Sequence, residues 1–144
     1  RHQVGEVLKQ SMIGNIQNIR DLASNLEHFE AERIEKVKAR ITEALESLEN
    51  VVYDGNRLEQ ELIYYIERLD VNEEKTRLIN HLDYFLETIN SDSSQGKKLG
   101  FIVQEIGREI NTLGSKSNHS DMQRIVVQMK DELEQVKEQI LNVL

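Results

Sequence analysis

The sequence has no cysteine, no proline and no tryptophan, and only seven glycines among its 144 residues. The absence of cysteine excludes disulfides, thiolate zinc sites and cysteine nucleophiles, and it fits a reducing, cytoplasmic compartment. Because proline and glycine most disfavour helix interiors, their scarcity predicts long helices. No apolar run approaches the roughly 18 residues that a membrane-spanning helix needs, and no secretory signal is visible. We therefore expect no membrane association.

Acidic residues outnumber basic ones, and the net charge is −8. A chain with this charge repels a nucleic-acid backbone at long range, which weighs against a free-standing RNA binder. The charge is uneven, since residues 97 to 116 contain four basic and two acidic residues. This local excess of +2 leaves −10 for the rest of the chain.

Apolar residues recur at steps of three and four near both chain ends, as they do in helices that pack along a seam. These seams cover residues 5–29, 34–51 and 122–143. Such seams need helical partners, and the simplest solution pairs the first helix with the last. We predict an all-α fold, a helical bundle with long coiled-coil-like helices at the two chain ends.

The phase of the first two seams slips by a five-residue step at residues 29–33. We interpret the slip as a bend or hairpin, with a continuous helix containing a stutter as the alternative. An Asp-Gly-Asn sequence at 54–56 is a clear break. The chain is thus expected to divide into a long helical arm or hairpin over residues 1–53 and a helical domain over residues 54–144.

Capping and breaking residues predict shorter helices after that break. Asp70, with Glu73 three residues on, resembles a capping box. Gly114 is a residue type favoured just past a helix end. The expected helices cover about residues 57–69, 70–90 and 97–113, and a last one begins at Ser120.

The helix at 70–90 carries polar residues on one flank. Advancing about 100° per residue places His81 at the edge of the apolar stripe, beside Glu74 and Arg77. A histidine in that position can be a metal ligand or a general acid/base. Spacing alone favours a structural histidine paired with Glu74.

The helix at 97–113 has a matching polar flank. Glu105 and Glu109 are four residues apart, so their carboxylates can converge on a hard divalent cation, although such a pair is more often a solvated face. Gly100 and Gly107 form a bare strip where another backbone can approach closely. We expect the two helices to lie side by side, with their charged flanks facing a common ligand.

Cations and one aromatic residue add to this second helix. Lys97 and Lys98 stand at its start, where the helix dipole disfavours positive charge. Together with Arg108 and Lys116 they indicate an anion site. Phe101 is an apolar residue on the polar face, and three roles stay open for it: an interface contact, a stacking surface for a base, or a simply exposed side chain.

Two blocks of residues carry a family resemblance. Residues 70–85 contain an Asp, a Glu-Glu pair, Arg-Leu, and His-Leu with a Phe beyond, and residues 96–116 end in Arg-Glu-x-Asn-Thr-x-Gly-Ser-Lys. This pattern resembles the C-terminal part of the YicC/YloC family, loosely over the whole chain and closely over residues 70–118. The resemblance implies that the N-terminal domain usual in the family is absent here.

Two positions within the second block depart from the family pattern. Lys97 stands where the family usually has Arg, which keeps the charge and loses the planar fork. Gly100 stands where the family usually has Asp. That change puts in doubt any role that needs a carboxylate at this position.

The resemblance implies a bacterial endoribonuclease that needs a divalent cation, Mn²⁺ or Mg²⁺, and that assembles as a hexamer around RNA. A metal-bound water or a positioned base would attack the RNA backbone, and the residues do not decide between them. The implied catalytic residues are His81, Glu105 and Glu109. The implied metal ligands are Glu73, Glu74, Glu105 and Glu109. The implied RNA phosphate ligands are Arg77, Lys97, Lys98, Arg108 and Lys116.

A different class of function competes with this one, namely a non-catalytic helical module for oligomerisation or interaction. Its long seams would build an oligomer, and its polar blocks would be interface salt bridges. For this chain alone we expect little or no nuclease activity, because of its charge of −8 and the missing domain.

Overall fold

The computed structural model describes most of the chain, and the described residues fold into helices. They are residues 5–47, 56, 59–60, 62–64, 67, 70–91, 96–117 and 119–142. The helices with defined bounds are α1 (Glu6–Glu46), α3 (Asn72–Asn90), α4 (Gly96–Lys116) and α5 (Ser120–Leu141). No strand occurs in these ranges, so the all-α prediction is confirmed.

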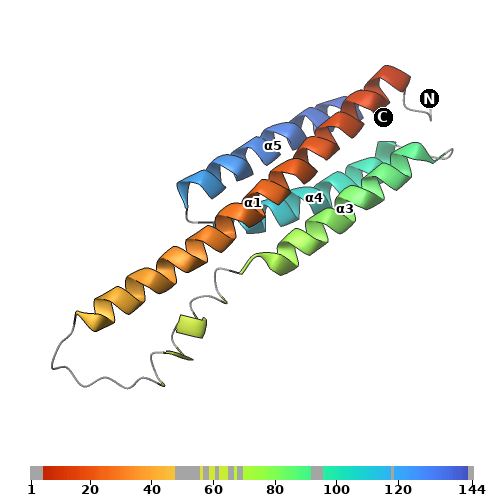
Figure 1. Cartoon of the computed structure of the whole chain (residues 1–144). Coiled ribbons are helices and arrows are strands. Elements are labelled where there is room, and N and C mark those ends of the chain that lie inside the picture. Colours follow the sequence, from red (N-terminus) through yellow and green to blue (C-terminus); the bar gives the residue numbers. More distant parts are fainter. Residues whose placement is uncertain are drawn as a thin grey trace.

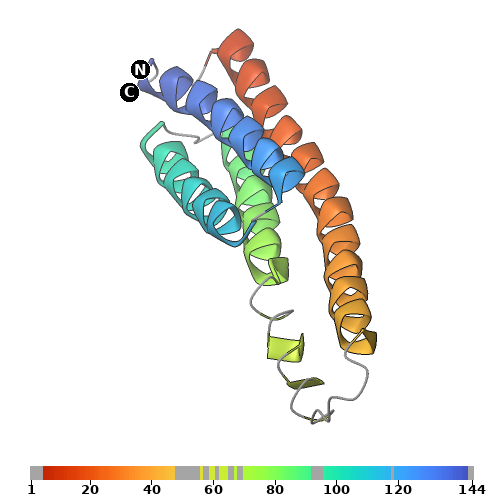
Figure 2. The ribbon, with the colours of Figure 1, turned by 90° about the vertical axis from the view of Figure 1, so that its left-hand side faces the viewer.

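The four helices form an elongated bundle in which α1 packs along α5 and α3 packs along α4, with further contacts between α4 and α5 and between α1 and α3 (Figure 1). The predicted pairing of the first and last helices is therefore confirmed. The second half of α1 extends beyond the other helices, and the start of α1 and the end of α5 lie together at the opposite end of the bundle (Figures 1 and 2).

The long helix α1 passes through residues 29–33 without a break, so the predicted bend or hairpin is wrong and the continuous helix is correct. The reason lies in its buried positions. These continue at steps of three and four from Met12 through Leu26 to Glu30 and Arg33. Glu30 and Arg33 thus occupy the buried positions where the apolar pattern is interrupted. The same face of the helix stays buried, and α1 continues without a bend.

The helix α4 extends to Lys116, so the predicted stop at Gly114 is wrong. Gly114 instead lies where α5 approaches closely, because a Cβ atom added there would be 3.2 Å from Cγ1 of Val126. Gly107 has a similar place, with an added Cβ 3.3 Å from Cδ2 of Leu133. These glycines serve helix packing.

The core is built from the apolar stripes of all four helices, as their spacing predicts. Its seam on α5 is buried at every described position from Met122 to Ile140. None of the helices in the described ranges is both long and apolar enough to cross a membrane. The largest fully buried side chains are Phe85, Met12, Ile16, Ile19, Leu26, Leu78, Leu82, Ile89, Leu99, Ile106, Ile110 and Leu113.

Part of the sequence-based prediction falls between α1 and α3. The Asp-Gly-Asn break, except for its last residue, and the boundary at 53/54 lie outside the described residues, so the division of the chain there stays a prediction. The helix expected at about 57–69 is described only at positions 59–60, 62–64 and 67, all of which are helical.

Candidate functional site

The polar flanks of α3 and α4 face each other, as expected from the sequence. Arg77 of α3 places its Nε atom 3.4 Å from Oε1 of Glu109 on α4. Lys116 of α4 places its Nζ atom 3.0 and 3.1 Å from the two carboxylate oxygens of Glu74 on α3. Ion pairs therefore connect the two helices along one line.

Two of these carboxylates are buried, since Glu74 is 2% exposed and Glu109 is 6% exposed. A buried charge is costly unless it is paired, and the pairs are supplied by Lys116 and Arg77. The Arg77 guanidinium also lies 2.9 Å from Glu73 and 4.0 Å from Glu74.

We call the alternating row of charges between α3 and α4 the charge ladder. Its cations pair with the two buried carboxylates and orient them. Its members, in order, are Lys116, Glu74, Arg77, Glu109 and His81.

His81 ends the charge ladder, with its Nε2 atom 3.9 Å from Oε2 of Glu109. The sequence-based pairing of His81 with Glu74 is therefore wrong, because Glu74 is bound to Lys116 and the carboxylate opposite His81 belongs to α4. The imidazole is partly exposed and a buried carboxylate stands behind it. An imidazole that is open to solvent and has a carboxylate beside it is an arrangement used in general acid/base chemistry.

In front of His81 lies a groove of about 290 Å³ between α3 and α4. We call it the α3/α4 groove. Its lining residues are His81, Tyr84, Lys98, Phe101, Ile102 and Glu105.

Glu105 and Glu109 do not act as a pair, although they are four residues apart. Glu109 is directed into the charge ladder, whereas Glu105 lines the α3/α4 groove and lies 3.6 Å from Nη2 of Arg108. Across the described part of the chain, no three His, Asp or Glu side chains gather in a geometry that could hold one metal ion.

The surroundings of the carboxylates decide which of them a divalent cation could reach. Glu74 and Glu109 are engaged by Lys116 and Arg77, which compete with a metal for their oxygens. Glu73 is exposed and pairs with Arg77, which leaves His81 and Glu105 as the two candidates that line a common groove. Such a pair fits only an open site, in which water and substrate phosphate complete the coordination shell, as is usual for Mg²⁺.

The five candidate phosphate ligands separate into three groups. Lys98 lines the α3/α4 groove, and Arg108 is exposed and lies 3.6 Å from Glu105 of the same groove. Arg77 and Lys116 belong to the charge ladder. Lys97 faces a different groove, between the start of α4 and the end of α5. Lys98 and Arg108 are therefore the cations best placed for an anion beside His81.

Gly100, where the family usually has Asp, also lines that other groove between α4 and α5. An added Cβ there would be 3.9 Å from Cγ2 of Ile140, an ordinary contact. The carboxylate that this chain lacks would thus lie on the side of α4 away from His81, and its absence leaves the α3/α4 groove unchanged.

Two site residues escaped the sequence analysis, namely Glu30 and Arg33 of α1. Glu30 accepts a hydrogen bond from the backbone N–H of Val71 at 3.3 Å, just before α3. Arg33 donates one to the carbonyl of Lys116 at 3.5 Å, at the end of α4. Burial raises the pKa of the Glu30 carboxyl above its ordinary value, an effect that the Val71 hydrogen bond and Lys75 oppose. Their position in the buried seam of α1 was the available signal, since charges at seam positions need polar partners.

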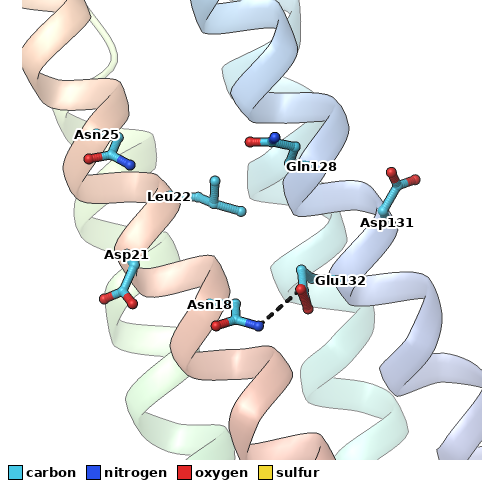
Figure 3. A pocket seen from close by; sticks show the side chains of 7 residues that line it. All are labelled: Asn18, Asp21, Leu22, Asn25, Gln128, Asp131 and Glu132. Carbon is cyan, nitrogen blue, oxygen red and sulfur yellow. Dashed lines mark hydrogen bonds between the residues drawn. The ribbon is translucent and has the colours of Figure 1, made fainter.

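A second polar groove, of about 420 Å³, separates α1 from α5 (Figure 3). We call it the α1/α5 groove. It contains the carboxylates of Asp21, Asp131 and Glu132, and Asn18 donates a hydrogen bond to Glu132 at 3.0 Å. None of its described lining residues is basic. The groove is therefore unsuited to an anionic ligand.

The fold and the site together define a class of protein: an all-helical bundle whose polar site joins an imidazole, carboxylates and cations between two helices. Residues 14–144 match the family model described as "Endoribonuclease YicC-like, C-terminal", and the chain belongs to this family.

Curated relatives agree with that assignment. The chain is 40% identical over 109 residues to a protein of Clostridioides difficile named "Probable endoribonuclease YicC", an alignment covering 76% of this chain and 36% of that protein. It is 42% identical over 89 residues to a protein of the same name from Haemophilus influenzae, covering 62% of this chain and 31% of the relative. The chain thus spans about a third of the length of these relatives.

Proposed function

We propose that this chain is the helical part of an endoribonuclease and that RNA is cleaved at the α3/α4 groove. The observation that carries the proposal is the position of His81, which opens into the groove in front while Glu109 is buried behind it. Cleavage of RNA requires a group that accepts a proton from the attacking hydroxyl and cations that stabilise the phosphate. The relatives named as probable endoribonucleases support the same reaction.

In the proposed mechanism the His81 imidazole takes the proton of the hydroxyl that attacks phosphorus. Glu109 then stabilises the imidazolium across the 3.9 Å that separates them. Lys98 and Arg108 neutralise the phosphate oxygens beside the groove. The His81 imidazolium then returns this proton to the leaving oxygen, so that the proton is conserved, while Glu105 on the same groove wall faces the phosphate site.

Dependence on Mn²⁺ or Mg²⁺ is part of the proposal, and so is assembly of the full-length protein as a hexamer around RNA; both follow from the family resemblance. Glu105 is the residue of the α3/α4 groove that would hold the cation through its carboxylate, which leaves the His81 imidazole free for proton transfer. A bound divalent cation would supply Lewis-acid stabilisation of the phosphate.

A second candidate function, assembly, is favoured by the groove between α4 and α5, which shares Phe101 with the α3/α4 groove. Phe101 and Leu141 are 69% and 70% exposed and border a groove of about 590 Å³ between α4 and α5. Exposed apolar surface of this kind marks contact sites. Leu141→Asp should lower the oligomer mass of the full-length protein in light scattering if this surface joins subunits, and an unchanged mass would count against it.

The proposal is tested by cleavage of a structured RNA by the full-length protein, with and without Mn²⁺. We expect His81→Ala to lower the rate about 100-fold or more and to leave the melting temperature unchanged, because the side chain is partly exposed. Asp131→Ala, in the α1/α5 groove, is the matched control and should cleave normally. Unchanged cleavage by both His81→Ala and Glu105→Ala would remove the α3/α4 groove from the chemistry.

The metal part is tested separately by calorimetric titration with Mn²⁺. Uptake that Glu105→Ala abolishes and Asp131→Ala preserves would support the open site. Equal uptake by wild type and Glu105→Ala would contradict it.

A further inference from the structure

We infer that Tyr84 and Phe101 form a stacking subsite for an unpaired nucleobase of the RNA bound in the α3/α4 groove. The inference rests on the proposed function and adds a substrate class to it. The RNA must present an unpaired base next to the phosphate that is cleaved, so single-stranded loops and bulges are substrates and uninterrupted duplexes are not.

The first support is the exposure of the two rings. The chain has only seven Phe and Tyr residues, yet Phe101 is 69% exposed and Tyr84 is 44% exposed. Phe85, next to Tyr84 in sequence, is fully buried in the core, whereas the Tyr84 ring lies outside the core. A single exposed ring is unremarkable, but here two rings from different helices line one groove.

The second support is the cation that accompanies them. The Lys98 ammonium lies 5.4 Å from the ring centre of Tyr84, within the range of a cation–π contact. Lys98 also lines the groove that contains His81. Aromatic faces combined with a cation that attracts the backbone are the usual elements of single-strand binding sites, where each base stacks on a ring.

The third support is the size and chemistry of the groove. Its volume of about 290 Å³ is at the lower end of the range for small-molecule sites, so it suits one nucleotide better than a protein segment. Glu105 on its wall accepts hydrogen bonds and can bond the amino group of a base. In an A-form duplex the bases stack on each other inside the helix, and protein rings reach only bases that are splayed out.

The test compares loss of the ring with loss of the base. The full-length protein and its Phe101→Leu variant cleave a stem-loop RNA in which each loop base in turn is replaced by an abasic residue. We expect Phe101→Leu to raise KM about 5- to 100-fold on the intact RNA. One abasic replacement should raise KM equally for the wild type and should add nothing in the variant.

Three outcomes contradict the inference: no effect of Phe101→Leu, additive losses at every loop position, or a change in oligomer mass without a change in base dependence. The last would show that Phe101 contacts another protein copy. Tyr84→Leu provides a second variant, and Val127→Ala, at an exposed position on α5, is the control expected to behave as wild type. If the proposed function itself fails, His81→Ala cleaves the intact RNA normally, which separates the two failures.

Discussion

The α3/α4 groove and the α1/α5 groove both lie between packed helices, yet their linings differ in chemistry. The α1/α5 groove holds three carboxylates and side-chain amides. The α3/α4 groove holds an imidazole, an ammonium, one carboxylate and two aromatic rings. The net charge of −8 is therefore not spread evenly over the surface of the bundle. The described lining of the α1/α5 groove contains three carboxylates and no basic residue, whereas one ammonium and one carboxylate line the α3/α4 groove.

The comparison also shows two ways of placing a carboxylate. Glu132 in the α1/α5 groove is held by neutral amides, with Asn15 and Asn18 donating to its two oxygens at 2.8 and 3.0 Å. Glu109 in the charge ladder is buried and held by a guanidinium. In the first arrangement neutral amides of α1 bind a carboxylate of α5, and no cation takes part in these two hydrogen bonds. In the second a guanidinium binds a buried carboxylate that lies beside His81.

The largest expected effect comes from reversing the charge beside the α3/α4 groove. We expect the double change Lys98→Glu and Arg108→Glu to weaken RNA binding by the full-length protein about 100-fold at low salt, because two phosphate contacts become repulsive. Asp131→Lys, which places a new cation in the α1/α5 groove, should change binding little. Fluorescence anisotropy with a labelled RNA measures both, and equal effects of the two changes would mean that the grooves do not differ in this respect.

The next largest effect is the loss of folding stability when Glu109 or Glu132 is replaced by glutamine. Glu109→Gln should lower the free energy of unfolding by about 1–2 kcal/mol, less than a fully buried pair would lose, because Arg77 is half exposed and can be hydrated. Glu132→Gln should cost about 0.5 kcal/mol, since the amide oxygen still accepts one of the two hydrogen bonds. Urea unfolding of both variants checks the order, and a larger loss for Glu132→Gln would reverse it.

A smaller effect is expected from alanine substitutions at the glycines of α4, which should change stability without changing cleavage. Gly100→Ala should stabilise the fold by about 0.5–1 kcal/mol, because the new methyl group meets only an ordinary contact with Ile140. Gly107→Ala should gain less, since its methyl group would be 3.3 Å from Leu133. Cleavage should be unchanged in the Gly100 variant; a loss would show that this side of α4 takes part in the reaction.

The smallest effect concerns pH. Since burial raises the folded-state pKa of Glu30 above 4.5, the folded chain binds the proton more tightly than the unfolded chain. The contribution of Glu30 to stability is thus most favourable below pH 4.5 and declines as pH rises through the folded-state pKa. Asp70, Arg33 and Lys75 are the charged groups that act on it.

The matching variant is Glu30→Gln, which keeps a carbonyl oxygen for the Val71 N–H. It should be more stable than wild type at neutral pH and equal to it near pH 4. Thermal melts at the two pH values measure this, and a constant difference would mean that Glu30 is not the titrating group.

Sequence reasoning accounts for most of the fold, because apolar periodicity determines which faces of α3, α4 and α5 are buried. It failed at residues 29–33 for a physical reason. The seam of α1 continues through charged residues whose partners, such as the Val71 N–H, lie more than 35 positions away in sequence, and no local pattern contains them. The predicted helix end at Gly114 was wrong for a similar reason, because this glycine allows the close approach of Val126 on α5, which is distant in sequence.

The sequence predicted which residues of the candidate site share a helix face, but it did not predict which charged side chains pair with each other. Helical geometry placed His81, Arg77 and Glu74 on one face of α3. Which carboxylate each cation meets depends on the register of α3 against α4, which helical periodicity within one segment does not determine. In the folded chain the carboxylate beside His81 is Glu109, and Glu74 pairs with Lys116.

The central claim, that RNA meets the α3/α4 groove, is tested most directly by ultraviolet crosslinking of a bound RNA to the full-length protein, followed by mass spectrometry of the crosslinked peptides. The account predicts crosslinks within residues 77–84 and 97–108 and their loss in Phe101→Leu. Crosslinks confined to residues 18–25 and 128–132, or to segments outside this chain, would contradict it.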